Sequence, residues 1–202
     1  MLMRLLHRPN AEARFWRWFQ VNSGRLFRFE EAQDVVFRDL SRALSRVHKS
    51  LCFEFGPDRN GVREFIISAD GNKKAFLAVQ ALARAAPQLK EWLIIPFRPP
   101  KSLDQYPVLR YGEHRLTIDD VWFTHETVGE KVELVLYIRG LTKALQEDLG
   151  YASFLLLDMA LGEFVVETRV GAITRLPLPD DPAAAGLLPF RKVVEVVALP
   201  HH

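Results

Sequence analysis

Apolar residues recur at helical spacing over the first 50 residues of the chain. A first helix is expected to begin after Pro9, with Asn10 as its N-cap, and to end near Gln20. A second is expected from about Glu30 to His48, where an apolar stripe returns every three to four residues. The pattern therefore predicts an N-terminal pair of helices.

The next segment alternates apolar and polar residues, which is typical of strands. Residues 51–55 and 63–68 are expected to form a hairpin with a three-residue loop, Arg59-Asn60-Gly61. A helix over residues 73–86 and an apolar strand over residues 92–95 follow. Strand, helix and strand in this order predict a βαβ unit, whose two strands run parallel.

The second half continues the alternation in two more hairpins, centred on Gly112-Glu113 and Gly129-Glu130. Two short helices separated at Gly150 are expected next. Valine-rich patterns then predict strands at Glu163–Val170 and Lys192–Ala198, with a proline-rich loop between them.

These elements predict an α+β protein with one mixed, largely antiparallel sheet and helices packed on it. The length of 202 residues favours a single domain over residues 1–202. Its expected parts are a helical region 1–50, a sheet-and-helix core 51–175, and a proline-rich loop with a terminal strand, 176–202.

Charge is unevenly placed along the chain. Residues 1–50 hold ten Lys and Arg against five Asp and Glu, whereas residues 51–202 hold 17 against 20. An arginine stripe at Arg38, Arg42 and Arg46 is interpreted as a solvated helix face. The excess of positive charge in residues 1–50 is smaller than that of a typical nucleic-acid-binding surface, so nucleic-acid binding is disfavoured.

The compartment is inferred from Cys52 and from the hydropathy pattern. One cysteine cannot form an internal disulfide, which fits a reducing environment. The apolar run Tyr151–Leu161 is too short to span a bilayer, and Met1–Leu6 is shorter than a signal-peptide core. A cytoplasmic protein that binds no membrane is therefore expected.

Aromatic residues are concentrated in the first helix, at Phe15, Trp16, Trp18 and Phe19. Such a helix either packs on two sides or exposes an apolar patch that a partner covers. The second alternative makes a homodimer, or a protein partner bound through this helix, a hypothesis.

Common catalytic motifs are missing from the sequence, which contains no glycine-rich phosphate loop, HExxH, paired CxxC or GxSxG. No cofactor and no metal are therefore expected. Cys52 has no basic neighbour in sequence to lower its pKa, so packing is favoured over catalysis.

Polar residues gather where a site could form at the edge of the βαβ unit. The hairpin register places Glu54, Glu64 and Ser68 on one face, and Asp70 follows the second strand. Arg98 follows the third strand, and ligands of α/β sheets bind at this edge. The alternative is an Asp70–Arg98 pair that only fixes a loop.

Two acidic residues of the second half complete the set of candidate catalytic residues. Asp158 lies within an apolar run and needs a partner or a role in a site, and Glu163 follows Gly162. A structural partner is favoured for Asp158.

Several short motifs resemble a bacterial family that is known only as a domain of unknown function. They are LCFEFG at residues 51–56, EFIISADG at 64–71, AAP at 85–87 before Trp92, FRP at 97–99 and LGE at 161–163. The resemblance covers roughly residues 15–170. It implies a bacterial, cytoplasmic, stand-alone domain, and it implies no reaction, cofactor or partner.

The sequence therefore favours a non-catalytic binding or interaction module. The alternative is a small-molecule enzyme, hydrolase-like, that uses the carboxylates at the sheet edge.

Overall fold

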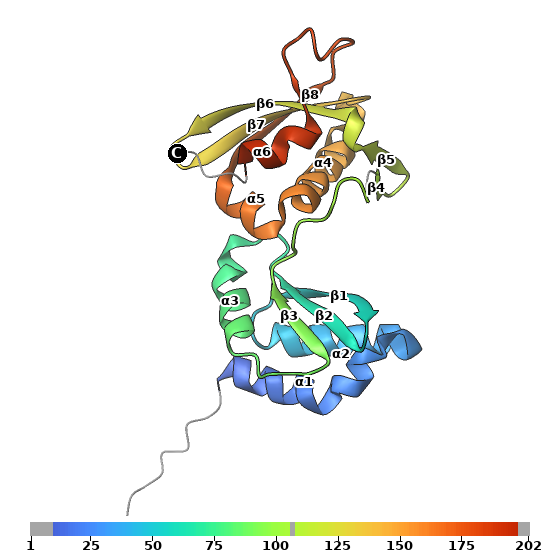
Figure 1. The fold of residues 1–202 in the computed structure, drawn as a ribbon, viewed down its shortest axis with the longest axis vertical. Helices are drawn as coiled ribbons and strands as arrows, with labels where there is room; N and C mark the ends of the chain where they lie inside the picture. The colour runs from blue at the N-terminus through green and yellow to red at the C-terminus, as the bar shows by residue number, and fades with distance from the viewer. Residues whose placement is uncertain (1–9, 106–107, 198–202) are drawn as a thin grey trace, which may run out of the picture. The chain divides into compact units, whose positions relative to one another are not determined.

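The computed structural model describes residues 10–105 and 108–197 (Figure 1). The chain divides into two compact units, residues 1–97 (unit 1) and 98–202 (unit 2), each with its own sheet and buried apolar cluster. The predicted single domain stays a prediction. The segment Met1–Leu6, interpreted above as too short for a signal peptide, lies outside the described residues.

From residue 10 onward, unit 1 is built from three helices and a three-stranded sheet, joined by short 3-10 turns. In chain order its elements are α1 (Ala11–Phe27), η1 (Phe29–Ala32), α2 (Gln33–Ser45), β1 (Cys52–Arg59), β2 (Val62–Ser68), η2 (Lys73–Ala75), α3 (Phe76–Arg84) and β3 (Trp92–Pro96). The predicted N-cap is confirmed, since the Asn10 side chain accepts a hydrogen bond from the Ala13 N–H at 2.9 Å.

The sheet of unit 1 has the order β1-β2-β3, with β1 and β2 antiparallel and β2 and β3 parallel. The predicted βαβ pairing is therefore confirmed, and the pairing of Phe53 with Ile67 places Glu54, Glu64 and Ser68 on one face, as predicted. A register shift between Phe55 and Asp58 separates this part of the ladder from the loop. The hairpin loop has two residues rather than three, because Arg59 pairs with Val62 and both Asn60 and Gly61 have positive φ. That backbone is typical of a type I′ turn.

Side chains from α1, α2 and α3 form one buried cluster with alternate residues of the three strands. Phe65 and Ile67 of β2 point into this cluster and are fully buried. The opposite face of the sheet is mixed and includes Leu93 of β3, which is 51% exposed. One face of β3 is therefore open at Leu93, although all of residues 92–95 are apolar.

The described residues of unit 2 form two sheets and three helices. Its elements are β4 (Val108–Tyr111), β5 (His114–Thr117), η3 (Ile118–Asp120), β6 (Val121–Val128), β7 (Lys131–Ile138), η4 (Lys143–Leu145), α4 (Gln146–Leu161), α5 (Glu163–Arg169), β8 (Val170–Pro177), β9 (Leu188–Pro189), η5 (Phe190–Lys192) and α6 (Val193–Val197). The four-stranded sheet has the order β8-β7-β6-β9, and β4 and β5 form a separate hairpin.

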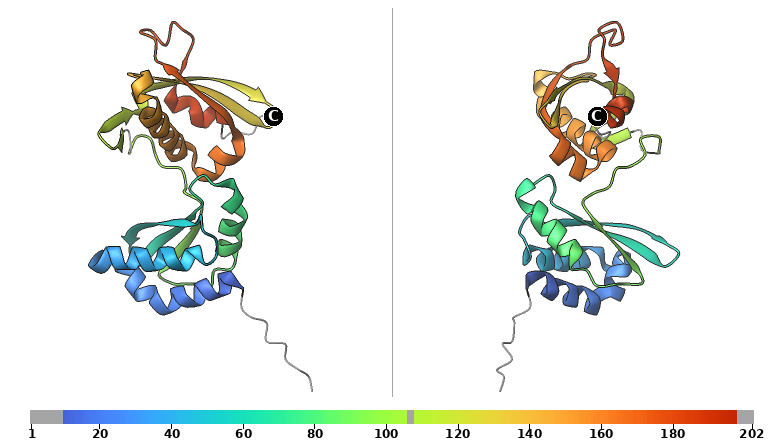
Figure 2. Two further views of the ribbon diagram at one scale, coloured as in Figure 1. Left: turned by 180° about the vertical axis from the view of Figure 1, so that it is seen from behind. Right: turned by 60° about the vertical axis from the view of Figure 1, so that its left-hand side comes forward.

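The registers of both unit 2 hairpins are as predicted, with Val121 opposite Ile138 and Glu126 opposite Glu133. Val132, Leu134 and Leu136 of β7 pack against helices α4, α5 and α6. These helices lie on the same side of the sheet in two opposite views (Figures 1 and 2).

The α+β class is confirmed, but the single sheet was wrong, because the described strands form three sheets. The sheet of unit 1 ends at β3, and Pro99 and Pro100, which lack a backbone N–H, come soon after it. The hairpins further along the chain pair only with neighbours in unit 2.

Two predicted strands of unit 2 are helices. Residues 163–169 form α5, and the expected terminal strand at residues 192–198 contains α6. Val193 and Val197 are both fully buried at i, i+4 spacing, which places one face of a helical turn in the core. The strand preference of valine is overridden here by packing.

The predicted break at Gly150 was also wrong, since α4 is continuous through it. A Cβ at Gly150 would lie 3.4 Å from Cδ of Arg175, so this glycine allows close packing. Among the described residues, no single helix is long and apolar enough to cross a bilayer. The segments Lys143–Leu161 and Glu163–Arg169 meet that criterion only together, across a bend of 107°.

Candidate functional site

The candidate site residues are divided between the two units. Glu54, Glu64 and Ser68 lie in unit 1 on the sheet face opposite the helices, and Asp70 lies in the turn that follows β2. Arg98, Asp158 and Glu163 lie in unit 2. A role in catalysis stays a prediction for all seven.

In unit 1 the polar residues have local structural partners. Ser68 is fully buried, and its hydroxyl accepts a hydrogen bond from the backbone N–H of Asp70 at 3.0 Å. Asp70 and Gly71 both have positive φ, so Ser68 stabilises a tight turn between β2 and η2. Glu64 packs over Gly56, where a Cβ would come within 2.7 Å of its carboxylate.

In unit 2 the structure brings Arg98, Asp158 and Glu163 together. The Arg98 guanidinium lies 3.9 Å from the Asp158 carboxylate. The backbone N–H of Arg98 donates to Glu163 Oε2 at 3.2 Å, and the N–H of Glu163 donates to the Arg98 carbonyl at 3.0 Å. Glu163 is only 1% exposed, and a carboxylate at that depth requires such donors.

This cluster anchors an extended segment to the junction of α4 and α5. The Lys101 N–H donates to the carbonyl of Met159, the residue that follows Asp158, at 2.7 Å. Gly162 separates the two helices with φ of +80°, and a Cβ there would lie 2.9 Å from Pro100 Cδ and 3.1 Å from the Arg98 carbonyl. These contacts give the buried carboxylates a role in the fold.

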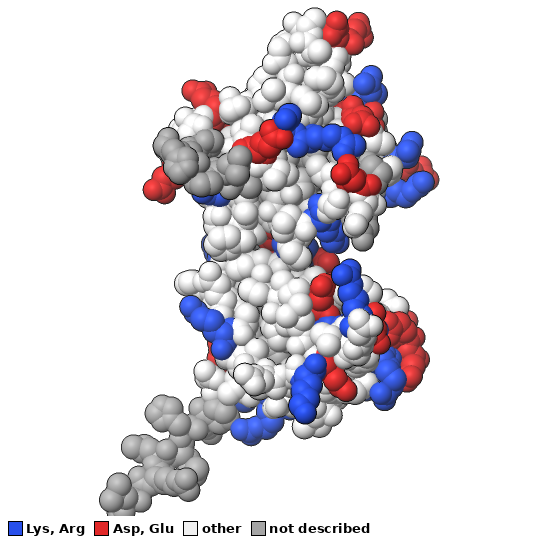
Figure 3. Space-filling view, viewed as in Figure 1, with Lys and Arg blue, Asp and Glu red and all other residues white. Residues whose placement is uncertain are grey.

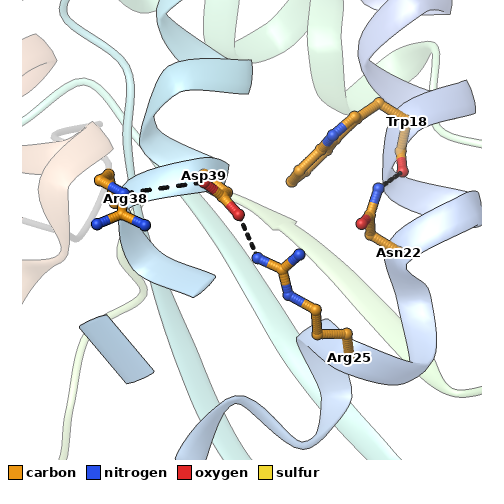
Figure 4. Close-up of polar contacts among 5 residues, drawn as sticks. All are labelled: Trp18, Asn22, Arg25, Arg38 and Asp39. Atoms are coloured by element: carbon orange, nitrogen blue, oxygen red, sulfur yellow. Dashed lines mark hydrogen bonds and ion pairs between the residues drawn. The ribbon is translucent and has the colours of Figure 1, made fainter. Parts of the chain in front are cut away.

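A different group of polar side chains lines a groove of unit 1 between α1 and α2 (Figure 4). The groove has a volume of about 190 Å³. Its walls are Trp18, Asn22 and Arg25 from α1, Asp39, Arg42 and Ala43 from α2, and Arg46, the C-cap residue of α2. We call this set the α1–α2 groove.

The groove follows from the spacing of residues on two helices. Trp18, Asn22 and Arg25 occur at i, i+4 and i+7, which places them on one face of α1. Asp39 and Arg46 bracket the matching face of α2, and Arg25 pairs with Asp39. This pair closes one end of the groove, so Trp18 and Arg46 lie toward the other.

Asp39 is the single carboxylate of the groove. It accepts a hydrogen bond from Arg25, and this contact, with the charges of Arg25, Arg38 and Arg42, holds the pKa of Asp39 below its ordinary value. The side chain of Arg38 approaches Asp39 from outside the groove (Figure 4).

The two remaining cations are not neutralised in this way. Within the described part of the chain, Arg25 and Arg38 contact a carboxylate, but Arg42 and Arg46 form no ion pair. Three arginines against one carboxylate leave two positive charges, in a groove whose base includes Ala43, only 6% exposed. Both Arg42 and Arg46 are exposed, so an anion in solution can reach them.

Unit 2 has a larger hollow of about 480 Å³, lined among others by Lys101, Asp104 and Arg191. There the Arg191 guanidinium already contacts Asp104 at 2.6 Å and Asp119 at 3.9 Å. The α1–α2 groove is therefore the site with the clearer excess of charge.

The sequence signal for this groove was present but incomplete. Arg42 and Arg46 were noted as part of a solvated stripe, and Trp18 as one of four neighbouring aromatics. Their convergence depends on how α1 and α2 pack, which the spacing on either helix does not specify. Phe15, Trp16 and Phe19 are buried in the core, whereas Trp18 is half-buried beside the groove.

On the face of unit 1 seen in Figure 3, basic and acidic side chains are interspersed. No group of three or more His, Cys, Asp or Glu that could hold a metal ion occurs among the residues described.

Comparison of the chain with protein-family models, with curated proteins and with solved structures finds no match. The resemblance to a bacterial domain of unknown function therefore stays a prediction. The proposal about function therefore rests on the residues of the α1–α2 groove.

Proposed function

We propose that this protein is a non-catalytic binding module that holds an anionic ligand in the α1–α2 groove. The observation that carries the proposal is the pair of arginines, Arg42 and Arg46, that line the groove and form no ion pair among the described residues. Guanidinium groups are the preferred protein partners of carboxylates and phosphates.

The proposal keeps the first helix as a binding element, but it assigns the ligand contact to a different aromatic residue of that helix. Phe15, Trp16 and Phe19 are core residues, so Trp18 is the member of that run that reaches the groove. A homodimer or a protein partner bound through this helix stays a prediction, which sedimentation of the purified protein tests.

The anchoring role of Arg98, Asp158 and Glu163 supports a module over an enzyme, since buried carboxylates with structural partners need no catalytic role. The hydrolase-like alternative stays a prediction. The single Cys52, which cannot form an internal disulfide, supports a cytoplasmic location, and the family resemblance supports a bacterial source.

The test is a titration of the ¹⁵N-labelled full chain with sodium benzoate, sulfate and phosphate at constant ionic strength. We expect at least one of these anions to shift the side-chain NMR signals of Arg42, Arg46 and the Trp18 indole. Chloride at the same ionic strength should leave them in place.

The matched control is an exposed arginine in the last turn of another helix. Arg42→Gln combined with Arg46→Gln should abolish the response, whereas Arg84→Gln at the end of α3 should preserve it. A response to none of the anions, or one that is equal in both variants, would contradict the proposal.

A further inference from the structure

The charge balance of the α1–α2 groove carries information about the kind of anion it holds. Arg25 and Asp39 neutralise each other, because they form an ion pair at one end of the groove. Arg42 and Arg46 then remain as two cations on successive turns of α2. Their β-carbons are about 6 Å apart at this spacing, close enough for both guanidiniums to reach one group.

A carboxylate does not match this arrangement fully. It carries one negative charge, so one of the two guanidiniums would keep an uncompensated charge in the groove. A phosphomonoester carries close to two negative charges at neutral pH and has three strong acceptor oxygens. It can therefore accept hydrogen bonds from both arginines.

The groove lining beside the cations is mainly polar, but it includes one aromatic ring. The half-buried Trp18 indole lies on α1, and the Ala43 methyl group on α2 is almost completely buried. A groove of about 190 Å³ has room for a phosphate and part of the group attached to it. An aromatic group next to the phosphate would stack on the indole, and aromatic pairs favour such contacts.

We propose that the α1–α2 groove binds a phosphomonoester of an aromatic group, with Arg42 and Arg46 holding the phosphate and Trp18 contacting the ring. This inference rests on the proposed function, because it assigns the ligand class of the same groove. Asn22, whose amide donates to the Trp18 carbonyl at 2.8 Å, keeps its side chain on the same wall.

The test compares phenyl phosphate with benzoate, which share a ring and differ in charge and number of oxygens. Isothermal titration calorimetry on the full chain should show phenyl phosphate binding at least tenfold more tightly, roughly the effect of one more charge-assisted hydrogen bond. Equal affinities would overturn this inference and leave the anion-binding function standing. Binding of neither compound, sulfate or phosphate would overturn both.

A pH series separates the dianion from a general charge effect. The second pKa of a phosphomonoester is about 6, so lowering the pH from about 7.5 to about 5.5 should weaken phenyl phosphate about fourfold. Benzoate remains a monoanion over this range, and its affinity should stay constant. An affinity for phenyl phosphate that is independent of pH would contradict the assignment.

Two variants assign the roles of the side chains. Arg42→Gln should weaken phenyl phosphate about tenfold or more, and Arg84→Gln should not. Trp18→Leu should reduce the preference for phenyl phosphate over methyl phosphate, whereas the affinity for methyl phosphate should change little. An unchanged preference for phenyl phosphate over methyl phosphate in Trp18→Leu would contradict a contact between the indole and the ring of the ligand.

The source of the phosphate is distinguished with O-phosphotyrosine and adenosine monophosphate, two small aromatic phosphomonoesters. Tighter binding of O-phosphotyrosine would identify a phosphorylated tyrosine as the ligand, and tighter binding of adenosine monophosphate would identify a nucleotide. Failure of both to compete with phenyl phosphate would contradict a site for natural aromatic phosphomonoesters. A single-stranded oligonucleotide, whose internal diesters carry one charge each, should compete poorly, and strong competition by it would overturn the proposal.

Discussion

Unit 1 and unit 2 both place helices on one face of a sheet, but different side chains fill the space between them. The buried cluster of unit 1 is rich in aromatic rings, among them Phe15, Trp16, Phe19, Phe65 and Trp92. That of unit 2 is mostly leucine, isoleucine and valine, and among its described residues only Phe123 and Phe190 are buried aromatics. A three-stranded sheet offers few core positions, and each aromatic side chain there buries a large area.

The rings of unit 1 also contact one another in defined geometry. Phe19 lies 4.9 Å from Phe65 and 5.0 Å from Trp92 between ring centres, and 5.3 Å from Trp16 at an interplanar angle of 63°. Tilted and edge-on pairs of this kind are favourable beyond the area they bury. The stability of unit 1 should therefore depend strongly on single rings.

The largest expected effect is that of Phe19→Ala. Phe19 is fully buried, and its removal should lower the free energy of unfolding of unit 1 by about 3–5 kcal/mol through lost transfer energy and a cavity. The measurement is urea unfolding followed by tryptophan fluorescence in a Trp122→Phe background. Because Trp122 is the only tryptophan of unit 2, the remaining signal reports unit 1.

The control for this variant is Val21→Ala, on the same helix and 82% exposed, which should change stability by less than about 0.5 kcal/mol. Leu156→Ala, at a fully buried position of unit 2, should leave the fluorescence transition in place and lower the stability of unit 2 in circular dichroism. An equal fluorescence shift in Leu156→Ala would show that the two units unfold together.

The second prediction concerns a backbone position of unit 2 rather than its side chains. Gly162→Ala should cost about 2–4 kcal/mol, because positive φ is unfavourable for alanine and its Cβ would clash with Pro100 and the Arg98 carbonyl. Gly186 also has positive φ, at +74°, but nothing lies within 4 Å of a Cβ there. Gly186→Ala should therefore cost only about 1–2 kcal/mol, the conformational part alone.

Thermal unfolding by circular dichroism compares these two variants. A large difference would confirm that the contact of residues 98–100 with the α4–α5 junction stabilises unit 2. An equal loss of stability in the two variants would mean that Pro100 and the Arg98 carbonyl move away from the new Cβ at little cost.

The elements that sequence predicts well are those with local signals. The register of a regular hairpin follows from alternation and turn residues, as in the pairing of Val121 with Ile138 around Gly129-Glu130. The Asn10 cap and the parallel pairing of β2 with β3 also follow from short-range rules. The elements it misses, such as α6, depend on which face of a valine-rich segment the core buries.

The candidate site residues also divide into those that local signals predict and those that depend on tertiary packing. Asp158 was selected because an acid in an apolar run needs a partner, and the structure provides Arg98 as that partner. The α1–α2 groove was not predicted, because it joins side chains from two helices whose relative packing is a tertiary property. What the sequence showed was Trp18 and the arginines as separate features.

The third prediction tests whether the rings of unit 1 also stabilise a buried charge. The side chain of Arg63 is 8% exposed, lies over the Phe27 and Phe29 rings at 5.2 and 4.8 Å, and donates to Glu30 at 2.7 Å. Arg63→Met keeps a long unbranched side chain that can pack on the rings, but it removes the guanidinium charge. We expect a loss of about 1–2 kcal/mol in urea unfolding from the two cation–π contacts and the hydrogen bond.

The comparison variant is Arg59→Met, since Arg59 is an exposed arginine at the end of β1, and it should be close to neutral. A stabilised Arg63→Met protein would show that burying the guanidinium, whose Nε has no hydrogen-bond partner, costs more than the rings return.

The smallest expected effect is the pH dependence of the same contact. Burial raises the pKa of Glu30, but its backbone hydrogen bond and the Arg63 guanidinium lower it more, so the pKa lies below its ordinary value. A carboxyl whose pKa is lower in the folded state stabilises the fold above its unfolded pKa. That contribution disappears as the pH falls through the folded pKa.

The stability difference between the natural protein and Glu30→Gln should therefore be constant near neutral pH and shrink below about pH 4.5. The side chain of Glu30 is 56% exposed, so solvent screens the pair and the difference should be small. Glu31→Gln, whose side chain is 71% exposed and does not contact the rings, provides the baseline in the same urea series. A difference for Glu30→Gln that persists unchanged into the acid range would mean that the amide loses packing rather than charge. The aromatic core of unit 1 would then gain nothing electrostatic from the Arg63–Glu30 pair.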